Sequence, residues 1–154
     1  MRFNLCGLML VAAFGLSACG AKEAEPPPPP PKKSLARQAV FYQGQEQIVS
    51  VSSASAAPGE TPGTLHLKID GVAASTGYTD TGFVPRIYAA TPPDGIYEVD
   101  VVGTRPATAT PRTPTPVHIE GVWAGYKADR LKGVKFITKT NEMTAMLPAK
   151  PAGS

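Results

Sequence analysis

The segment Thr64-Leu65-His66-Leu67-Lys68-Ile69-Asp70 alternates between apolar and polar side chains over most of its length. Successive side chains of a β-strand point to opposite faces of a sheet, so the three aliphatic side chains share one face and the polar side chains between them share the other. This pattern is typical of a strand with one face in a core and the other in water. The segment therefore predicts a protein built from β-strands.

Other segments repeat this pattern at short intervals along the chain. Residues 96–101 alternate in the same way, and they follow Pro92-Pro93-Asp94-Gly95, a typical turn sequence. Thr140-Asn141 is expected to close a tight hairpin between the last two strands. The remaining expected strands are 47–53, 83–89, 117–123, 133–139 and 142–147.

Seven short strands separated by proline- and glycine-rich turns favour an all-β fold. We expect an antiparallel β-sandwich of Ig-like type, with a small β-barrel as the alternative. The 17 prolines and 15 glycines among 154 residues disfavour a bundle of long helices. Because both cysteines precede these strands, large aromatic side chains are expected to fill the centre of the sandwich. They are Phe83, Tyr88, Tyr97, Trp123 and Phe136.

The N-terminal region has a different composition. An uncharged stretch of 12 residues, from Leu5 to Leu16, follows Arg2. It is too short to cross a bilayer as a helix, which takes about 20 residues, and it has the features of a secretory signal peptide. The sequence Leu16-Ser17-Ala18-Cys19 matches a lipobox, and here the chain resembles the bacterial lipoproteins. That resemblance implies cleavage before Cys19 and lipid attachment to its thiol. An ordinary signal peptide ending at Ala18 is the alternative.

The chain is therefore expected to have three parts. They are a signal peptide over 1–18, a lipid anchor and proline-rich linker over 19–33, and a β-domain over 34–154 with its core at about 46–147. The six consecutive prolines of the linker favour an extended spacer of roughly 19 Å, or else a docking segment for a proline-recognising partner. Gly20, where an aspartate would imply retention at the inner membrane, implies delivery to the outer membrane by the same resemblance. The domain would then lie in the periplasm or at the cell surface.

The charged and metal-binding residues exclude several classes of function. From Ser34 onward, 11 Lys and Arg residues face 10 Asp and Glu residues, so nucleic acid is not an expected partner. With Cys6 in the leader and Cys19 lipidated, no residue is left for thiol chemistry or a disulfide. His66 and His118 lie in alternating runs that turn them toward solvent, and their spacing fits no metal-binding motif. No metal and no cofactor is expected.

One pair of carboxylates could support catalysis. Glu98 and Asp100 lie two residues apart on one expected strand, hence on the same face and roughly 7 Å apart, within the range of glycosidase carboxylates. We expect them to be ordinary side chains on a solvated strand face and assign no catalytic residue. A carboxylate-based hydrolase acting on an envelope glycan is the alternative that they leave open.

Two further segments are candidates for binding a partner. Residues 103–116 contain four prolines, five threonines and two arginines without an acid, and are expected to form a crossover loop or, alternatively, a partner-binding loop. Residues 123–135 place two aromatics beside several cations, which suits an anionic polymer or lipid headgroups, although Trp123 in the core beside a solvated strand face is the plainer expectation. The candidate binding residues are Trp123, Tyr126, Lys127, Arg130, Lys132 and Lys135.

These patterns together predict a non-catalytic lipoprotein of the cell envelope. It would be held on the membrane through Cys19, and its β-domain would bind another envelope protein or an anionic polymer. Besides the hydrolase, a module that inhibits or chaperones a partner through residues 103–116 stays open as an alternative.

Overall fold

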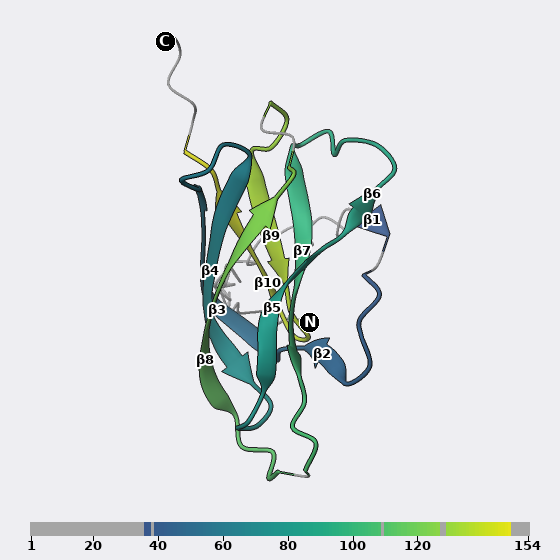
Figure 1. Cartoon of the computed structure of the whole chain (residues 1–154), viewed down its shortest axis with the longest axis vertical. Coiled ribbons are helices and arrows are strands. Elements are labelled where there is room, and N and C mark those ends of the chain that lie inside the picture. The colour runs from purple at the N-terminus through teal and green to yellow at the C-terminus, as the bar shows by residue number, and fades with distance from the viewer. Residues whose placement is uncertain (1–35, 38, 109, 127–128, 149–154) are drawn as a thin grey trace, which may run out of the picture. The chain divides into compact units, whose positions relative to one another are not determined.

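The computed structural model describes residues 36–37, 39–108, 110–126 and 129–148, and every regular element in these ranges is a β-strand (Figure 1). The strands are β1 (Ala36–Arg37), β2 (Gln45–Gln47), β3 (Ser50–Pro58), β4 (Thr64–Ala73), β5 (Thr79–Pro85), β6 (Ile87–Tyr88), β7 (Ile96–Thr104), β8 (Thr115–Ala124), β9 (Gly133–Ile137) and β10 (Glu142–Met146).

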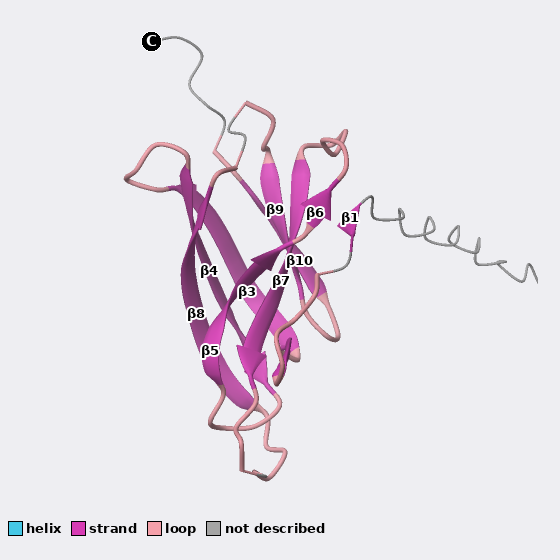
Figure 2. Cartoon of the chain, turned by 45° about the vertical axis from the view of Figure 1, so that its right-hand side comes forward, coloured by secondary structure: helices cyan, strands magenta, loops and turns pink. Residues whose placement is uncertain are grey.

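Two sheets pack face to face, and the expected all-β sandwich is confirmed (Figure 2). The three-stranded sheet has the order β3-β4-β8. The five-stranded sheet has the order β10-β9-β7-β2, and β5 pairs with the other edge of β7. Strands β1 and β6 form a separate two-stranded ladder. Within the described ranges the strands close no barrel.

The expectation of a purely antiparallel arrangement is wrong for one pair, because β7 and β9 run parallel, with Ile96 opposite Gly133 and Asp100 opposite Ile137. The physical reason lies in the connection. After β7 the chain crosses to the three-stranded sheet, where β8 pairs with β4. The chain then returns to the five-stranded sheet, so that β9 runs in the same direction as β7.

The expected strand 47–53 is divided between the two sheets. The amide of Ile48 donates to the carbonyl of Val101 in the five-stranded sheet (3.0 Å), whereas the amide of Val49 donates to the carbonyl of Val72 in the three-stranded sheet (2.9 Å). Because Ile48 is buried in the core at this crossing, the change of sheet helps to close one side of the sandwich.

The expected strand 83–89 begins earlier and is interrupted. Strand β5 starts at Thr79 and ends at Pro85, whose ring nitrogen cannot donate to a ladder. Arg86 follows outside the strands, and residues 87–88 pair with β1 instead. This break sets the position of Arg86 in the site described below.

Both expected turns are confirmed. The amide of Gly95 donates to the carbonyl of Pro92 (3.0 Å), and Gly95 has the positive φ of 73° that a glycine adopts without strain. Asn141 closes the β9–β10 hairpin and does more than turn the chain. Its side-chain amide donates to the carbonyl of Val51 (2.7 Å) and accepts from the amide of Val51 (2.9 Å), so it ties the hairpin to the opposite sheet.

The core is mostly aliphatic. Phe136 is fully buried and meets Phe83 edge to face at 5.5 Å, while Gly121 leaves room for the Phe83 ring, since a Cβ there would lie 2.9 Å from it. Tyr97 and Trp123 are half-buried and pack against this core, whereas Tyr88 is half-buried and meets Tyr97 edge to face. The expectation that these three rings fill the centre is therefore wrong, although two of them contact it. The largest buried aliphatic residues take their place: Ile48, Leu65, Leu67, Ile69, Ile119, Val99, Val101 and Val134.

The expected signal peptide, Cys19 and the proline-rich linker lie outside the described residues. Among the residues that are described, no helix has the length and apolar composition to span a bilayer.

Candidate functional site

Glu98 and Asp100 lie on the outer face of the five-stranded sheet, but that face is not solvated. Asp100 is 0% exposed and Glu98 is 7% exposed, so the expectation of surface carboxylates is wrong. The reason is Arg86, which follows the break after β5. Its amide donates to the carbonyl of Glu98 (3.0 Å), and this bond brings its side chain over both carboxylates.

The Arg86 guanidinium binds both carboxylates. Its Nε and Nη2 donate to the two oxygens of Asp100 at 2.7 and 2.9 Å, and its Nη1 donates to Glu98 Oε2 at 3.0 Å. Gln47 Nε2 also donates to Asp100 Oδ1 (2.5 Å), and Lys135 lies 3.7 Å from Glu98. The two-pronged contact with Asp100 is the strongest cause that raises the pKa of Arg86 above its ordinary value. The positive charges of Arg86 and Lys135 thus match the negative charges of Glu98 and Asp100 in number.

This arrangement bears on the two carboxylates that the hydrolase alternative would use. A glycosidase carboxylate must reach a water molecule or a sugar, whereas Asp100 is sealed and both of its oxygens accept hydrogen bonds from Arg86. Arg86, Asp100, Glu98 and Gln47 form a structural cluster that fixes the guanidinium in place.

Tyr88 joins this cluster to a neighbouring cleft. Its hydroxyl oxygen accepts a hydrogen bond from the amide of Glu98 (2.9 Å). Burial raises the pKa of Tyr88 to about 12, so the hydroxyl keeps its proton at neutral pH. In the part of the chain that the structure describes, no acceptor takes that proton. The group is a donor held in a fixed position.

Four aromatic rings form a continuous row beside this donor. Tyr88 and Tyr97 meet edge to face at 5.2 Å, Tyr97 and Trp123 do so at 6.1 Å, and Trp123 and Tyr126 are tilted at 6.2 Å. All four are half-buried, so each ring keeps some exposed surface. The row begins after β5, crosses the start of β7 and ends just beyond β8.

A cleft of about 480 Å³ opens over this row. Trp123 does not line it, but its ring meets those of Tyr97 and Tyr126. The cleft is lined by Arg86, Tyr88, Ala89, Ala90, Thr91, Tyr97, Gly125, Tyr126 and Arg130. Its volume is in the range of ordinary ligand sites, which combine apolar walls with a few fixed polar groups.

The predicted basic segment 123–135 is not a single patch. Lys135 lies on the outer face of the five-stranded sheet, 3.4 Å from Glu142 and 3.7 Å from Glu98, while Arg130 lines the cleft and lies 3.4 Å from Asp129. Lys132 is exposed, and Lys127 lies outside the described residues. Of the five candidates that the structure describes, Tyr126 and Arg130 line the cleft.

Sequence reasoning missed Arg86, Tyr88 and Tyr97 as cleft residues, because it assigned both tyrosines to the core. A usable signal was Pro85-Arg86, a proline followed by a charged residue in the middle of an expected strand.

The two histidines lie on the outer face of the three-stranded sheet, and both are exposed as expected. His118 contacts Asp70 (2.7 Å) and Glu120 (3.0 Å), and these carboxylates raise its pKa above the ordinary 6.5. Across the described ranges, no group of three or more histidine, cysteine, aspartate or glutamate side chains is arranged to hold a metal ion.

Strand β7 ends at Thr104 in one sheet and β8 begins at Thr115 in the other, so the crossover expected within 103–116 is confirmed. Several of its residues line a second cavity, which lies at the opposite end of β7 from the aromatic cleft.

No family model, curated protein or solved structure matches this chain.

Proposed function

We propose that this protein is a lipid-anchored binding protein of the bacterial envelope, and that its aromatic cleft binds an envelope polysaccharide. The observation that carries the proposal is the cleft itself, in which Tyr88, Tyr97 and Tyr126 present ring surface beside fixed polar groups. The anchor is supported by the lipobox at Cys19 and by the proline-rich linker that follows it.

The chemistry of the cleft suits a sugar. A sugar ring has an apolar face of C–H groups and a rim of hydroxyls, and a tyrosine offers an apolar ring with a polar tip. Tyr88 supplies a donor whose direction is fixed by the amide of Glu98, and Thr91 and Arg130 supply further polar contacts. These few groups can orient a ligand that the rings hold.

The charge of the cleft favours a neutral or weakly acidic glycan over a strongly anionic polymer. Asp100 and Glu98 neutralise Arg86, and Arg130 lies 3.4 Å from Asp129. The cleft therefore has little net charge to attract an anion. The candidate residues Lys132 and Lys135 do not line it.

Titration calorimetry on the full chain in detergent tests the cleft, with soluble peptidoglycan fragments and the polysaccharide released from lipopolysaccharide as probes. Tyr126→Ala should weaken binding roughly ten-fold, since it removes a ring from the wall. Tyr42→Ala is the matched control, because Tyr42 is 83% exposed and lies outside the cleft. Absence of binding to both glycans, or an equal loss of affinity in the two variants, would refute glycan binding in the cleft.

Metabolic labelling with a fatty acid tests the anchor separately. Cys19→Ala should abolish labelling, whereas Cys6→Ala should leave it intact, because Cys6 lies within the expected leader. Labelling that persists in Cys19→Ala would contradict the lipobox assignment and leave the cleft proposal unaffected.

A further inference from the structure

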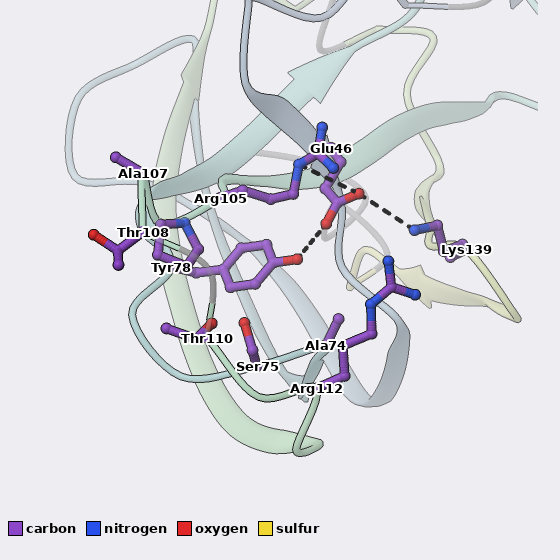
Figure 3. A pocket seen from close by; sticks show the side chains of 11 residues that line it. Glu46, Ala74, Ser75, Tyr78, Arg105, Ala107, Thr108, Thr110, Arg112 and Lys139 are labelled. Carbon is purple, nitrogen blue, oxygen red and sulfur yellow. Dashed lines mark hydrogen bonds and ion pairs between the residues drawn. The ribbon is translucent and has the colours of Figure 1, made fainter.

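The second cavity, of about 440 Å³, is formed where β2, β4, β7 and β9 approach the crossover loop (Figure 3). Tyr97 in the aromatic cleft and Thr104 at the end of β7 are seven residues apart, which separates the two ends of the strand by roughly 23 Å. The cavity is lined by Glu46, Ala74, Ser75, Tyr78, Arg105, Pro106, Ala107, Thr108, Thr110, Arg112 and Lys139.

Glu46 is the centre of the polar contacts in this cavity. The Tyr78 hydroxyl donates to Glu46 Oε1, Lys139 Nζ lies 3.3 Å from Oε2, and Arg105 Nε lies 3.9 Å from Oε2 (Figure 3). Burial opposes ionisation of Glu46, but Tyr78 and Lys139 outweigh it and lower the pKa of this carboxyl. Burial and the bond to Glu46 raise the pKa of Tyr78 to about 12. Glu46 is therefore ionised and Tyr78 neutral at pH 7.

The cavity has an excess of positive charge. Arg105, Arg112 and Lys139 line it against a single carboxylate, which leaves two formal positive charges. Arg112 makes no ion pair or hydrogen bond among the described residues. The guanidinium group of arginine offers paired donors that match the oxygens of a phosphate.

Hydroxyl groups complete the lining. Ser75 is only 7% exposed and follows the end of β4, while Thr108 and Thr110 belong to the crossover loop. Figure 3 shows Ser75 and Thr110 on one side of the Tyr78 ring, with Glu46 at its hydroxyl end. These hydroxyls can donate to an anion or bind the hydroxyls of an ester group attached to it.

We propose that this cavity binds a small phosphate ester, whose dianionic phosphate is held by Arg105, Arg112 and Lys139 and whose polar ester group contacts the threonines of the crossover loop. The inference is independent of glycan binding at the other end, because the two sites share no lining residue.

Titration calorimetry on the full chain in detergent, at fixed ionic strength, tests this site with glycerol 3-phosphate, inorganic phosphate and sulfate as probes. Saturable binding is expected with a Kd in roughly the millimolar range or below. Glycerol 3-phosphate should bind more tightly than inorganic phosphate, and sulfate should bind most weakly. Equal binding of all three would mean an adventitious ion only and would overturn the proposal, as would the absence of binding.

Two variants sharpen the test, because one removes a positive charge from the cavity and the other removes a negative charge. Arg112→Gln should weaken binding of glycerol 3-phosphate about ten-fold, because it removes a charged donor. Glu46→Gln should strengthen binding, because it removes the negative charge that competes for Lys139 and Arg105. Lys132→Gln is the matched control, since this exposed lysine lies near Gly95 at the far end of β7 and should not alter affinity. Equal losses in Arg112→Gln and Lys132→Gln, or weaker binding in Glu46→Gln, would refute the site.

Discussion

The outer faces of the two sheets both carry a cross-strand group of charged side chains, but in opposite environments. On the three-stranded sheet, Lys68, Asp70, His118 and Glu120 pair across β4 and β8 in open solvent. On the five-stranded sheet, Arg86 covers Asp100 and Glu98, and Asp100 is completely buried. The two faces have similar residue types at similar spacing.

The difference shows that the energetic role of a carboxylate on a strand face depends more on whether other side chains bury it than on its residue type. An exposed pair competes with water and salt, and contributes little to stability. A buried pair loses its hydration, so each member depends on the other. The Arg86 cluster is therefore expected to be sensitive to substitution, and the His118 group tolerant of it.

The largest expected effect follows from breaking the buried group. Asp100→Asn removes a fully buried charge that is bound by two guanidinium nitrogens and by Gln47, and leaves Arg86 undercompensated. We expect a loss of about 3 kcal/mol in the free energy of unfolding, measured by urea denaturation. Asp70→Asn on the open face is the control, and its free energy of unfolding should stay close to that of the parent protein.

A double variant tests whether the cost arises from the unpaired charge. Replacing Arg86 with Met and Asp100 with Leu removes both charges and leaves Glu98 near Lys135. The double variant should be more stable than Asp100→Asn alone, because it leaves no unmatched buried charge of the Arg86–Asp100 pair. If it is less stable, the cluster contributes more than the pairing of its charges.

Alternation along a strand assigned residues to faces correctly, but it carried no information about what covers a face. For β4 this was sufficient, since Leu65, Leu67 and Ile69 are buried while His66, Lys68 and Asp70 are exposed. For β7 it separated inward Val99 from outward Asp100, but it missed Arg86 and Gln47, which come from other strands or strand ends. Contacts of that kind depend on tertiary structure, and no local pattern encodes them.

A smaller effect is expected from the pH dependence of the open face. Glu120 and Asp70 raise the pKa of His118 above 6.5, and Lys68 and His118 lower the pKa of Glu120 to about 2. The contribution of protonated His118 should therefore be complete below pH 6.5 and vanish as the pH rises through its folded-state pKa. That of Glu120 should be present above pH 4.5 and vanish as the pH falls toward 2.

NMR titration of the histidine ring signals measures this effect, with His66→Gln used to assign the two histidines. Glu120→Gln should bring the pKa of His118 down toward its ordinary value. An unchanged titration would mean that the contacts with Glu120 do not persist in solution.

The smallest expected effect is that of Lys68→Gln. Lys68 and Glu120 lie 2.8 Å apart, but their side chains are 50% and 49% exposed. Because solvent and salt screen such a pair, the urea midpoint should stay close to that of the parent protein at physiological ionic strength. A marked loss of stability would show that the open face is better shielded than its exposure indicates.

The candidate sites were predictable only in part. Tyr126 and Arg130 belong to an aromatic and basic segment that stands out in the sequence, and the composition of residues 103–116 marked the crossover loop. Tyr88 and Tyr97 were assigned to the core, because a period-two pattern does not reveal how near a strand end a residue lies. Glu46 and Lys139 lie 93 residues apart in the chain, and only the fold brings them together.

The N-terminal strands also determine how the domain would respond to a pulling force. A load that enters from the N-terminal side meets β1 first, which has two residue pairs with β6, and then β2, which has three with β7. It next reaches β3, which pairs with β4 over eight positions. The start of β3 is also held at Val51 by the side chain of Asn141. Tension applied through an N-terminal tether would therefore peel away the short ladders, and expose the Glu46 side of the domain, before it reached the three-stranded sheet.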